Sequence, residues 1–438
     1  IATATVDCRG GVPPDGDPVR AATERSKGLL PFSGFVGTMS HGSERDEEPS
    51  SRFGIELGDG TSILGAVRDR YEVPALLVIV AAMLWIRLQS YSNFVRNGEV
   101  YFSGNDAWYH LRSVRYVVRH WPWTMPFDPW TNFPEGTFVG QFGTLYDQIV
   151  ATAALIVGLG SPSADLVAKV LLVTPAVAGA LTAVPTYLLG KRLAGRVAGL
   201  FGAVVLMLLP GTFLRRTLVG FADHNGVEPV FQVTAVLALA VALAVAQEER
   251  PIWELVTARE WDSLRRSTMW SAIAGLAVGL YIWVWPPGVL LLGIFSVYIV
   301  LQVFSDYGTA HSPDHVAFVA GVSMTVTAVV SLLKFQEATF SATKIGFLHT
   351  GFALAIAVTA VGLAWLARQF EAASFENAWL EENGFRAVVS AGIVFAIVSV
   401  ISIDAQPFGL IRNNLLRFVG FSAGAQTRTI GEAQPWLN

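Results

Sequence analysis

Residues Val227–Ala246 read VEPVFQVTAVLALAVALAVA, an apolar stretch whose only charged residue is Glu228. A helix needs roughly 20 such residues to cross the hydrocarbon core of a bilayer. Open β-structure cannot cross it, because backbone groups in lipid must be hydrogen-bonded internally. The stretch therefore predicts a transmembrane helix, and similar stretches recur along the chain.

The composition of the whole chain also indicates a membrane protein. Of 438 residues, 53% are hydrophobic and 15% are charged, whereas a typical soluble domain has about 25% charged residues. The mean hydropathy is +0.48 and the pI is about 6.0. The net charge of -4 gives no indication of a nucleic-acid partner. The single cysteine, Cys8, cannot form an internal disulfide.

Apolar stretches of this kind predict an all-α, polytopic integral membrane protein with about nine transmembrane helices. They lie at Val73–Trp85, Leu166–Leu189, Val197–Phe213, Val227–Ala246, Met269–Trp285, Gly288–Phe304, Val316–Leu333, Phe347–Leu366 and Ala387–Ile403. The first extends to about Ser90 if Arg87 reaches the membrane interface with its charged end. A shorter stretch, Leu145–Leu159, carries Asp147 and either spans the membrane or lies in its interface.

Basic loops predict the orientation of these helices. The loop Lys191–Arg196 and the segment Glu248–Ser267 are rich in Lys and Arg, so the positive-inside rule places both in the cytoplasm and Asp223 outside. If Leu145–Leu159 spans, the polar loop Ser92–Gly143 is cytoplasmic. If Leu145–Leu159 is interfacial, the N-terminal tail is cytoplasmic and this loop is outside. We adopt the second interpretation because the stretch is short and no signal peptide precedes the first helix.

These assignments predict a multi-pass protein of the cell membrane with four regions. Residues 1–38 form a non-native or disordered leader, and Met39 is the expected native start. Residues 39–72 form a cytoplasmic tail. Residues 73–403 form the transmembrane domain, in which 92–165 is the first external loop with its interfacial helix. Residues 404–438 begin a large external loop.

Three polar clusters fall on the predicted extracytoplasmic side. They are Gly104-Asn-Asp-Ala-Trp-Tyr-His-Leu-Arg112, Arg216-Thr-Leu-Val-Gly-Phe-Ala-Asp-His-Asn225 and Thr429-Ile-Gly-Glu432. An acid or imidazole beside a bilayer is costly and indicates function by default. Ordinary alternatives are helix N-caps for Asp106 and Asp223, a polar surface position for His110 and a solvated side chain for Glu432. Each motif alone carries little weight.

Taken together, in this order and on one face, the motifs resemble those of oligosaccharyltransferase catalytic subunits. The most similar pattern is that of the single-subunit archaeal enzymes, the dolichyl-phosphooligosaccharide-protein glycotransferases. The family's first acidic motif is matched by Asp106, and its Thr-Ile-x-Glu signature by Thr429–Glu432. Its second motif is matched by Arg216, Thr217, Gly220 and Asp223. The resemblance runs from about Tyr71 to the last residue and implies a GT-C-type glycosyltransferase architecture.

The resemblance implies transfer of a glycan from a polyprenyl (dolichyl) phosphate or pyrophosphate donor to the Asn of an Asn-X-Ser/Thr sequon. It implies that Asp106 and Glu432 are catalytic carboxylates that accept the hydrogens of the acceptor amide. It also implies an Mn2+ or Mg2+ ion, because oxygen ligands select hard cations. The implied metal ligands are Asp106, Asp223, Asn225 and Glu432, and the residues implied for the donor's lipid phosphate are Arg216 and His224.

Two features depart from the family pattern. Asn225 stands where the family usually has an acid or His, which leaves open whether Asn225 or His224 reaches the metal. The chain also ends at Asn438 before the family's Trp-Trp-Asp motif and C-terminal globular domain, which indicates a fragment. The alternatives are another polyprenyl-phosphate-dependent membrane glycosyltransferase, against which the Thr-Ile-Gly-Glu motif argues, and an ion-coupled transporter, which would place its acids near the midplane.

Overall fold

Long apolar helices make up most of the structure, a computed structural model that describes residues 70–403 except 250, 337 and 339, together with residue 409. These residues all belong to the unit Thr61–Asn438. The helices long and apolar enough to span are α2 (Glu72–Leu88), α6 (Ala164–Leu181) continuing into α7 (Ala183–Leu208), α9 (Glu228–Glu248), α11 (Trp261–Val284), α12 (Val289–Gly308), α13 (Asp314–Leu332), α14 (Phe347–Ala372) and α15 (Ala378–Ser402).

Shorter elements connect the long helices. They are the helices α3 (Tyr91–Phe94), α4 (Asp106–His120), α5 (Leu145–Val157), α8 (Thr212–Arg216) and α10 (Ile252–Thr257), the 3-10 helices η1 (His224–Gly226) and η2 (Pro286–Gly288), and the strands β1 (Val95–Arg96), β2 (Glu99–Val100), β3 (Phe127–Asp128) and β4 (Thr137–Phe138). Strand β1 pairs antiparallel with β2, and β3 with β4. The predicted all-α class is therefore confirmed, and the described residues add two small hairpins to it.

Each predicted apolar stretch contains a long helix, but two helices begin well before it. Helix α11 begins at Trp261 and α15 at Ala378, whereas their apolar stretches begin at Met269 and Ala387. The first turns of both helices carry charged residues, which a hydropathy pattern leaves out. The pattern therefore marks the length that suits a bilayer rather than the whole helix.

The segment Ala164–Leu208 is a helical hairpin rather than one helix. The backbone leaves helical geometry at Ala194 (φ -147°) and Gly195 (φ 86°). On the far side of this turn, a Cβ placed on Gly199 would lie 2.5 Å from the Tyr187 carbonyl oxygen, although a straight helix would separate these residues by roughly 18 Å. The described residues thus supply eight span-length candidates, one of which is folded back on itself at Ala194 and Gly195.

Small residues allow the central helices to pack closely. A Cβ on Gly275 of α11 would lie 2.2 Å from the Ser323 carbonyl oxygen of α13, and Thr327 Oγ1 donates to the Gly275 carbonyl oxygen at 3.0 Å. Helix α13 also packs along α14, and α11 along α9. Because lipid tails are as apolar as leucine, close backbone approach and interhelical hydrogen bonds hold such helices together.

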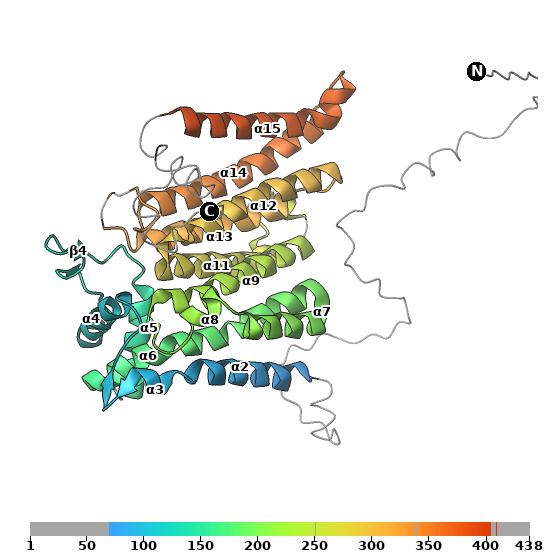
Figure 1. Ribbon diagram of the computed structural model, residues 1–438. Helices are drawn as coiled ribbons and strands as arrows, with labels where there is room; N and C mark the ends of the chain where they lie inside the picture. Colours follow the sequence, from blue (N-terminus) through green and yellow to red (C-terminus); the bar gives the residue numbers. More distant parts are fainter. Residues whose placement is uncertain (1–69, 250, 337, 339, 404–408, 410–438) are drawn as a thin grey trace, which may run out of the picture. The chain divides into compact units, whose positions relative to one another are not determined.

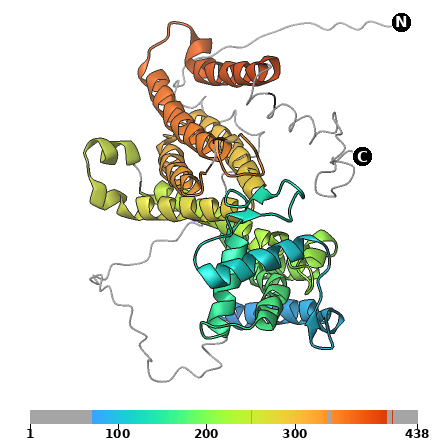
Figure 2. The ribbon, with the colours of Figure 1, turned by 90° about the vertical axis from the view of Figure 1, so that its left-hand side faces the viewer.

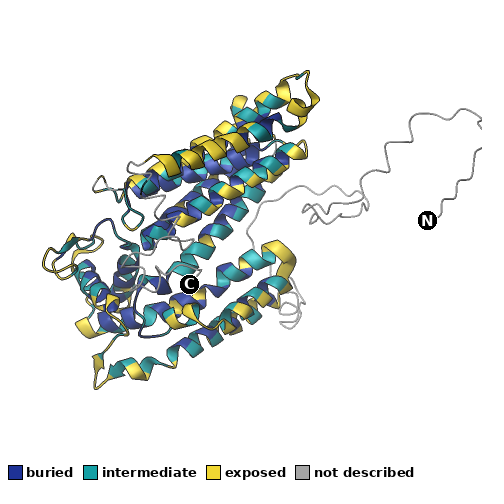
Figure 3. Cartoon of the chain, turned by 45° about the horizontal axis from the view of Figure 1, so that its top comes forward, coloured by how far each residue is buried: buried dark blue, intermediate teal, exposed yellow. Residues whose placement is uncertain are grey.

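Large apolar side chains cover the outside of the long helices. Leu301 of α12, Val358 of α14 and Phe395 of α15 are 63%, 71% and 75% exposed. Figure 3 shows these outer helices with exposed residues along their lengths. A soluble protein rarely exposes contiguous apolar surface of this kind, so these helices are suited to contact with lipid.

Polar elements gather at one end of the long helices. Helices α3, α4, α5 and α8 lie with strand β4 at this end (Figure 1), which faces the viewer in Figure 2. Helix α5 has 13 residues and is roughly 20 Å long at 1.5 Å per residue, whereas the hydrocarbon core is about 30 Å thick. This length favours the interfacial interpretation of Leu145–Leu159 over a span.

We expect Gly199→Ala to destabilise the hairpin, because the new methyl group would overlap the backbone of Tyr187 and Lys191. Overpacking of this kind costs about 1–3 kcal/mol, which would lower the thermal unfolding midpoint in detergent by a few degrees. Gly202→Ala is the matched control, since its Cβ would meet only Thr186 Cγ2 at 3.8 Å. Equal midpoints for the two variants would contradict this packing.

Candidate functional site

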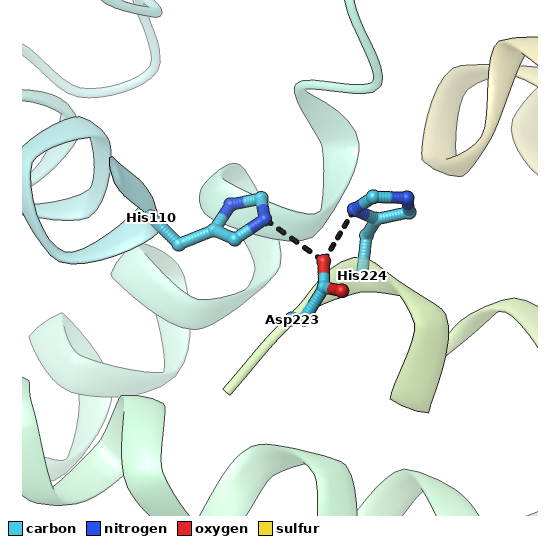
Figure 4. A group of neighbouring side chains, drawn as sticks. All are labelled: His110, Asp223 and His224. Atoms are coloured by element: carbon cyan, nitrogen blue, oxygen red, sulfur yellow. Dashed lines mark hydrogen bonds and ion pairs between the residues drawn. The ribbon is translucent and has the colours of Figure 1, made fainter. Parts of the chain in front are cut away.

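Two histidine side chains converge on one carboxylate oxygen of Asp223 at the polar end of the structure. His110 of α4 and the adjacent residues Asp223 and His224 present ligand atoms that lie within 4.8 Å of one another. Asp223 Oδ1 is 3.2 Å from His110 Nε2 and 2.6 Å from His224 Nδ1. Figure 4 shows both imidazole rings directed at this oxygen. His110 and Asp223 are buried, and His224 is 28% exposed, so the group opens toward the surface through His224.

A second carboxylate holds the other nitrogen of His110. Asp147 Oδ1 of α5 lies 2.7 Å from His110 Nδ1, and Asp147 is also buried. Burial lowers the pKa of His110, but Asp147 and Asp223 outweigh it and raise that pKa to about 10. Burial raises the pKa of Asp147, and this effect exceeds the opposite effect of the nearby His110 charge. The pKa of Asp223 is well below its usual range, because hydrogen bonds from His110 and His224 overcome its burial.

Aromatic rings fix the orientation of the His110 imidazole. The Tyr109 and Tyr146 rings meet it edge-on, with centroids at 5.0 Å and 4.8 Å. The buried Tyr146 hydroxyl has no hydrogen-bond partner within the part of the chain that the structure describes. Buried polar groups are nearly always satisfied by protein, water or an ion's ligands.

Asn225 makes hydrogen bonds within the second motif. Its amide nitrogen donates to Asp223 Oδ2 at 2.5 Å, and its amide oxygen accepts from Arg216 Nη1 at 3.1 Å. The structure therefore brings His224 Nδ1 into the three-residue group, while the Asn225 amide connects Asp223 to Arg216. A ligand role for Asn225 would require its amide to turn, and this role stays a prediction.

Gly220 allows the loop before Asp223 to pass close to α3. Its φ of +100° lies in a region that side chains rarely adopt, and an added Cβ would lie 2.4 Å from the Phe94 ring. The Gly220 carbonyl oxygen accepts from the Ser103 backbone N–H at 2.8 Å, just before α4. This bond joins the segment that carries Asp223 to the segment that leads into His110.

Arg87 of α2 is hydrogen-bonded to the same loop at Thr217 and Val219. Its Nε donates to Thr217 Oγ1 at 2.9 Å, and its carbonyl oxygen accepts from the Val219 backbone N–H at 3.3 Å. The side chain is 0% exposed and its guanidinium lies over the Phe213 ring at 5.1 Å. Its hydrogen bonds to Thr217 and the Met83 carbonyl oxygen hold the charged end of Arg87 inside the protein.

Other contacts join the first loop to two later loops. The Ile345 backbone N–H donates to the Gln141 carbonyl oxygen at 2.8 Å. In return, Gln141 Nε2 donates to the Ile345 carbonyl oxygen at 3.0 Å. His349 Nε2 lies 2.8 Å from the Pro286 carbonyl oxygen in η2. Because a carbonyl oxygen can only accept, His349 Nε2 is the donor of this bond. These bonds connect the segment before α5 to Ile345, and the start of α14 to η2.

The predicted site residues are brought together only in part. Asp106 is the exposed first residue of α4, one turn before His110, and lies outside the three-residue group. Glu432 lies outside the described residues. Neither Asp106 nor Asp223 acts as a side-chain cap: Asn105 precedes α4, and Asp223 precedes η1 without a capping bond.

His110 and Asp147 were missed as site residues. The alternative that His110 is a surface residue is wrong, because it is 3% exposed and bonded to two buried acids. A signal was present in the sequence, since Asp106 and His110 are four apart and so share one face of a helix. For Asp147, the acid in a short apolar stretch was the comparable signal.

The group has the chemistry of a divalent metal site. Two imidazole nitrogens and a carboxylate are ordinary ligands for divalent transition ions, with bonds of about 2.0–2.2 Å. Ligand atoms on one ion are then up to about twice that bond length apart, which the three atoms within 4.8 Å of one another nearly satisfy. Small side-chain shifts would suffice, so His110, Asp223 and His224 fit a metal ion.

Comparison with known proteins identifies the family. The protein-family description "Oligosaccharyl transferase STT3, N-terminal" matches residues 75–422. The chain belongs to this family. It is 58% identical over 376 residues to the dolichyl-monophosphooligosaccharide–protein glycotransferase AglB of Haloferax volcanii, a match that covers 86% of this chain and 35% of that relative.

Solved structures of the Archaeoglobus fulgidus oligosaccharyltransferase have a fold similar to that of this chain. The complex with an inhibitory peptide and a dolichol-phosphate superposes with a TM-score of 0.68 at 24% identity, covering 82% of this chain and 40% of that one. The complex with Zn and sulfate gives 0.62 at 24% identity, covering 79% and 43%. The chain thus spans less than half the length of these relatives.

We expect Gly220→Ala to disturb the loop that carries Asp223, because the added methyl group would overlap the Phe94 ring. Gly211→Ala is the matched control: its φ is +92°, but nothing lies within 4 Å of the added Cβ. Both variants incur the strain of a positive φ, about 1–2 kcal/mol, so a lower thermal unfolding midpoint for Gly220→Ala isolates the Phe94 contact. In a Phe94→Ala background, which lacks the ring, the unfolding midpoints of Gly220→Ala and Gly211→Ala should lie closer together. If the gap between the two midpoints stayed the same, the Phe94 contact would not be its cause.

Proposed function

We propose that this chain is the membrane-embedded part of an oligosaccharyltransferase, a glycosyltransferase of protein N-glycosylation. It transfers a glycan from a polyprenyl (dolichyl) phosphate or pyrophosphate donor to the Asn of Asn-X-Ser/Thr sequons. The observation that carries the proposal is the buried group on Asp223, which lies in the second acidic motif of a chain that belongs to the STT3 family.

The names of the relatives support the donor and the acceptor. The Haloferax relative is a dolichyl-monophosphooligosaccharide–protein glycotransferase, and the Archaeoglobus enzyme is solved with a peptide and a dolichol-phosphate. Such a reaction needs a lipid-linked donor in the membrane and a polypeptide outside it. The alternative of an ion-coupled transporter finds no support in these relatives or in a group that lies at the helix ends.

Asp106 and Glu432 are proposed to activate the acceptor amide. An amide nitrogen is a poor nucleophile because its lone pair is conjugated with the carbonyl, as the rotation barrier of about 18–20 kcal/mol shows. Carboxylates that accept the two amide hydrogens favour a twisted amide whose lone pair is available. Stabilising that twisted form more than the planar one lowers the barrier to transfer. The exposed position of Asp106 at the start of α4 suits contact with an incoming peptide.

The leaving phosphate is proposed to lie beside the group of His110, Asp223 and His224, away from the acceptor amide at Asp106. Asp106, Asp223 and Glu432 would hold a divalent cation such as Mn2+ or Mg2+, with Asn225 or His224 nearby. When bound, this cation would neutralise charge that develops on the leaving phosphate. Arg216 and His224 are proposed to contact that phosphate, since arginine forms paired hydrogen bonds with phosphate oxygens. The bond from Arg216 to Asn225 keeps the guanidinium beside the motif.

We further propose that this face is extracytoplasmic and that the N-terminus is cytoplasmic. The hairpin turn with Lys191 and Arg196 carries positive charge, and it lies one crossing before the Asp223 loop. The positive-inside rule then places the turn in the cytoplasm and Asp223 outside.

We expect Asp106→Ala and Glu432→Ala in the full-length protein each to reduce glycan transfer to an Asn-X-Thr peptide by about 100-fold or more, the size typical of a lost catalytic group. The measurement is the rate of glycopeptide formation by purified enzyme in detergent. Asp165→Ala is the control, because Asp165 is an exposed acid paired with Lys169 at the start of α6. Wild-type rates for both catalytic variants would refute the proposal.

Chelation should stop transfer and a divalent ion should restore it. After treatment with EDTA, we expect Mn2+ to restore more activity than Mg2+ at equal concentration, because imidazole ligands suit transition ions better than Mg2+. Re-addition of Ca2+ serves as a control for general ionic effects. Full transfer in the presence of EDTA would contradict a metal-dependent reaction.

A further inference from the structure

We propose that His110 is a metal ligand in this centre and that Asp147 is the positioning residue that presents it. The ligand is a divalent transition cation such as Mn2+, bound by His110 Nε2 together with Asp223 and His224. The inference rests on the proposed function only in taking a metal centre to exist at Asp223. It adds two residues from α4 and α5 to that centre.

The first argument is the direction of the His110 ring. Its Nε2 lies 3.2 Å from Asp223 Oδ1, and His224 Nδ1 approaches the same oxygen at 2.6 Å. Three ligand atoms from two separate segments therefore surround one point. A divalent ion at that point would replace the hydrogen bonds that now join them and would satisfy all three atoms at once.

The second argument is the contact on the opposite nitrogen. Asp147 Oδ1 accepts from His110 Nδ1 at 2.7 Å, so this nitrogen keeps its hydrogen, while a metal ion would displace the Nε2 proton that faces Asp223 and bind the Nε2 lone pair. Metal-binding histidines almost always donate their other N–H to a carboxylate, a carbonyl or water, and this contact fixes ring orientation and raises ligand basicity. Asp147 is 2% exposed, so its bond to His110 is shielded from water.

The third argument is that the Asn225 side chain bonds to residues of its own motif and is not directed at Asp223 Oδ1. Its amide nitrogen faces Asp223 and its amide oxygen faces Arg216, so both polar ends of the side chain are directed at residues of the motif. The imidazoles of His110 and His224 are directed at Asp223 Oδ1. The nitrogen ligands of the centre thus come from α4 and from the residue next to Asp223.

A purely structural role for His110 makes different predictions. A charged imidazole between Asp147 and Asp223 would bind α4 to α5 and η1 without any metal. Its removal would then lower the stability of the metal-free protein and leave metal affinity and the metal's spectrum unchanged. A ligand role changes both metal properties, so metal binding separates the two roles without an activity assay.

The experiment is Mn2+ binding to the full-length protein in detergent after EDTA treatment, measured by electron paramagnetic resonance. Pulsed spectra detect histidine nitrogen that is coordinated directly to Mn2+. We expect His110→Gln to weaken Mn2+ binding by about 10- to 100-fold and Asp147→Asn by about 10-fold, in the range seen for ligand-orienting contacts. We expect His224→Gln to retain a histidine nitrogen signal, and the double variant with His110→Gln to lose it.

Controls keep the outcome decisive. His120→Gln alters an exposed histidine of the same helix and should leave Mn2+ binding unchanged, and melting temperatures in EDTA report whether each variant folds. If His110→Gln binds Mn2+ like the wild type while Asp223→Ala does not, His110 is not a ligand and the metal centre stands. If Asp223→Ala also binds normally, both the centre and this inference fail. Should His110→Gln fail to fold, a wild-type or His224→Gln spectrum without histidine nitrogen would overturn the inference by itself.

Discussion

The contact of His110 with two buried carboxylates is the constraint on which this end of the structure depends. A buried acid is tolerated only when its charge is matched and its oxygens are hydrogen-bonded. The His110 imidazole lies between the two acids and meets both conditions for each of them. Its Nδ1 is 2.7 Å from Asp147 Oδ1, and its Nε2 is 3.2 Å from Asp223 Oδ1. Because Asp147 comes from α5, His110 from α4 and Asp223 from the loop just before η1, the bridge can form only if those segments hold fixed positions.

The neighbouring contacts supply those positions. Arg87 and Thr217 fix the start of the loop, Gly220 allows it to pass Phe94, and the Ser103 backbone joins it to the entry of α4. The residues of the second motif, Arg216–Asn225, therefore have two separate roles. Its Thr and Gly shape the backbone, whereas its Asp carries the chemistry. The long helices beneath provide a frame that is rigid because small residues and buried hydroxyls join helix to helix.

The sequence predicted the fold well because lipid imposes a simple physical rule. Each crossing needs a helix-length apolar stretch, and even the hairpin at Ala194-Gly195 appears as two stretches separated by a basic loop. The site was predicted less completely. Asp223 was found through its motif, but its partnership with His110 and Asp147 joins three distant segments, and periodicity carries no information on such contacts. The bond from Arg87 to Thr217 could not be predicted for the same reason, because it joins two distant segments of the chain.

The arrangement divides the proposed site into a prebuilt part and an open part. His110, Asp147 and Asp223 are buried and held by several contacts before any substrate arrives, so aligning them costs little during reaction, and such preorganisation is a large source of catalytic stabilisation. Asp106 lies exposed one turn away on the same helix, where a polypeptide could reach it from outside. A carboxylate that must contact an incoming amide cannot be enclosed in advance. Burial of one part and exposure of the other therefore follow from the different partners that each must meet.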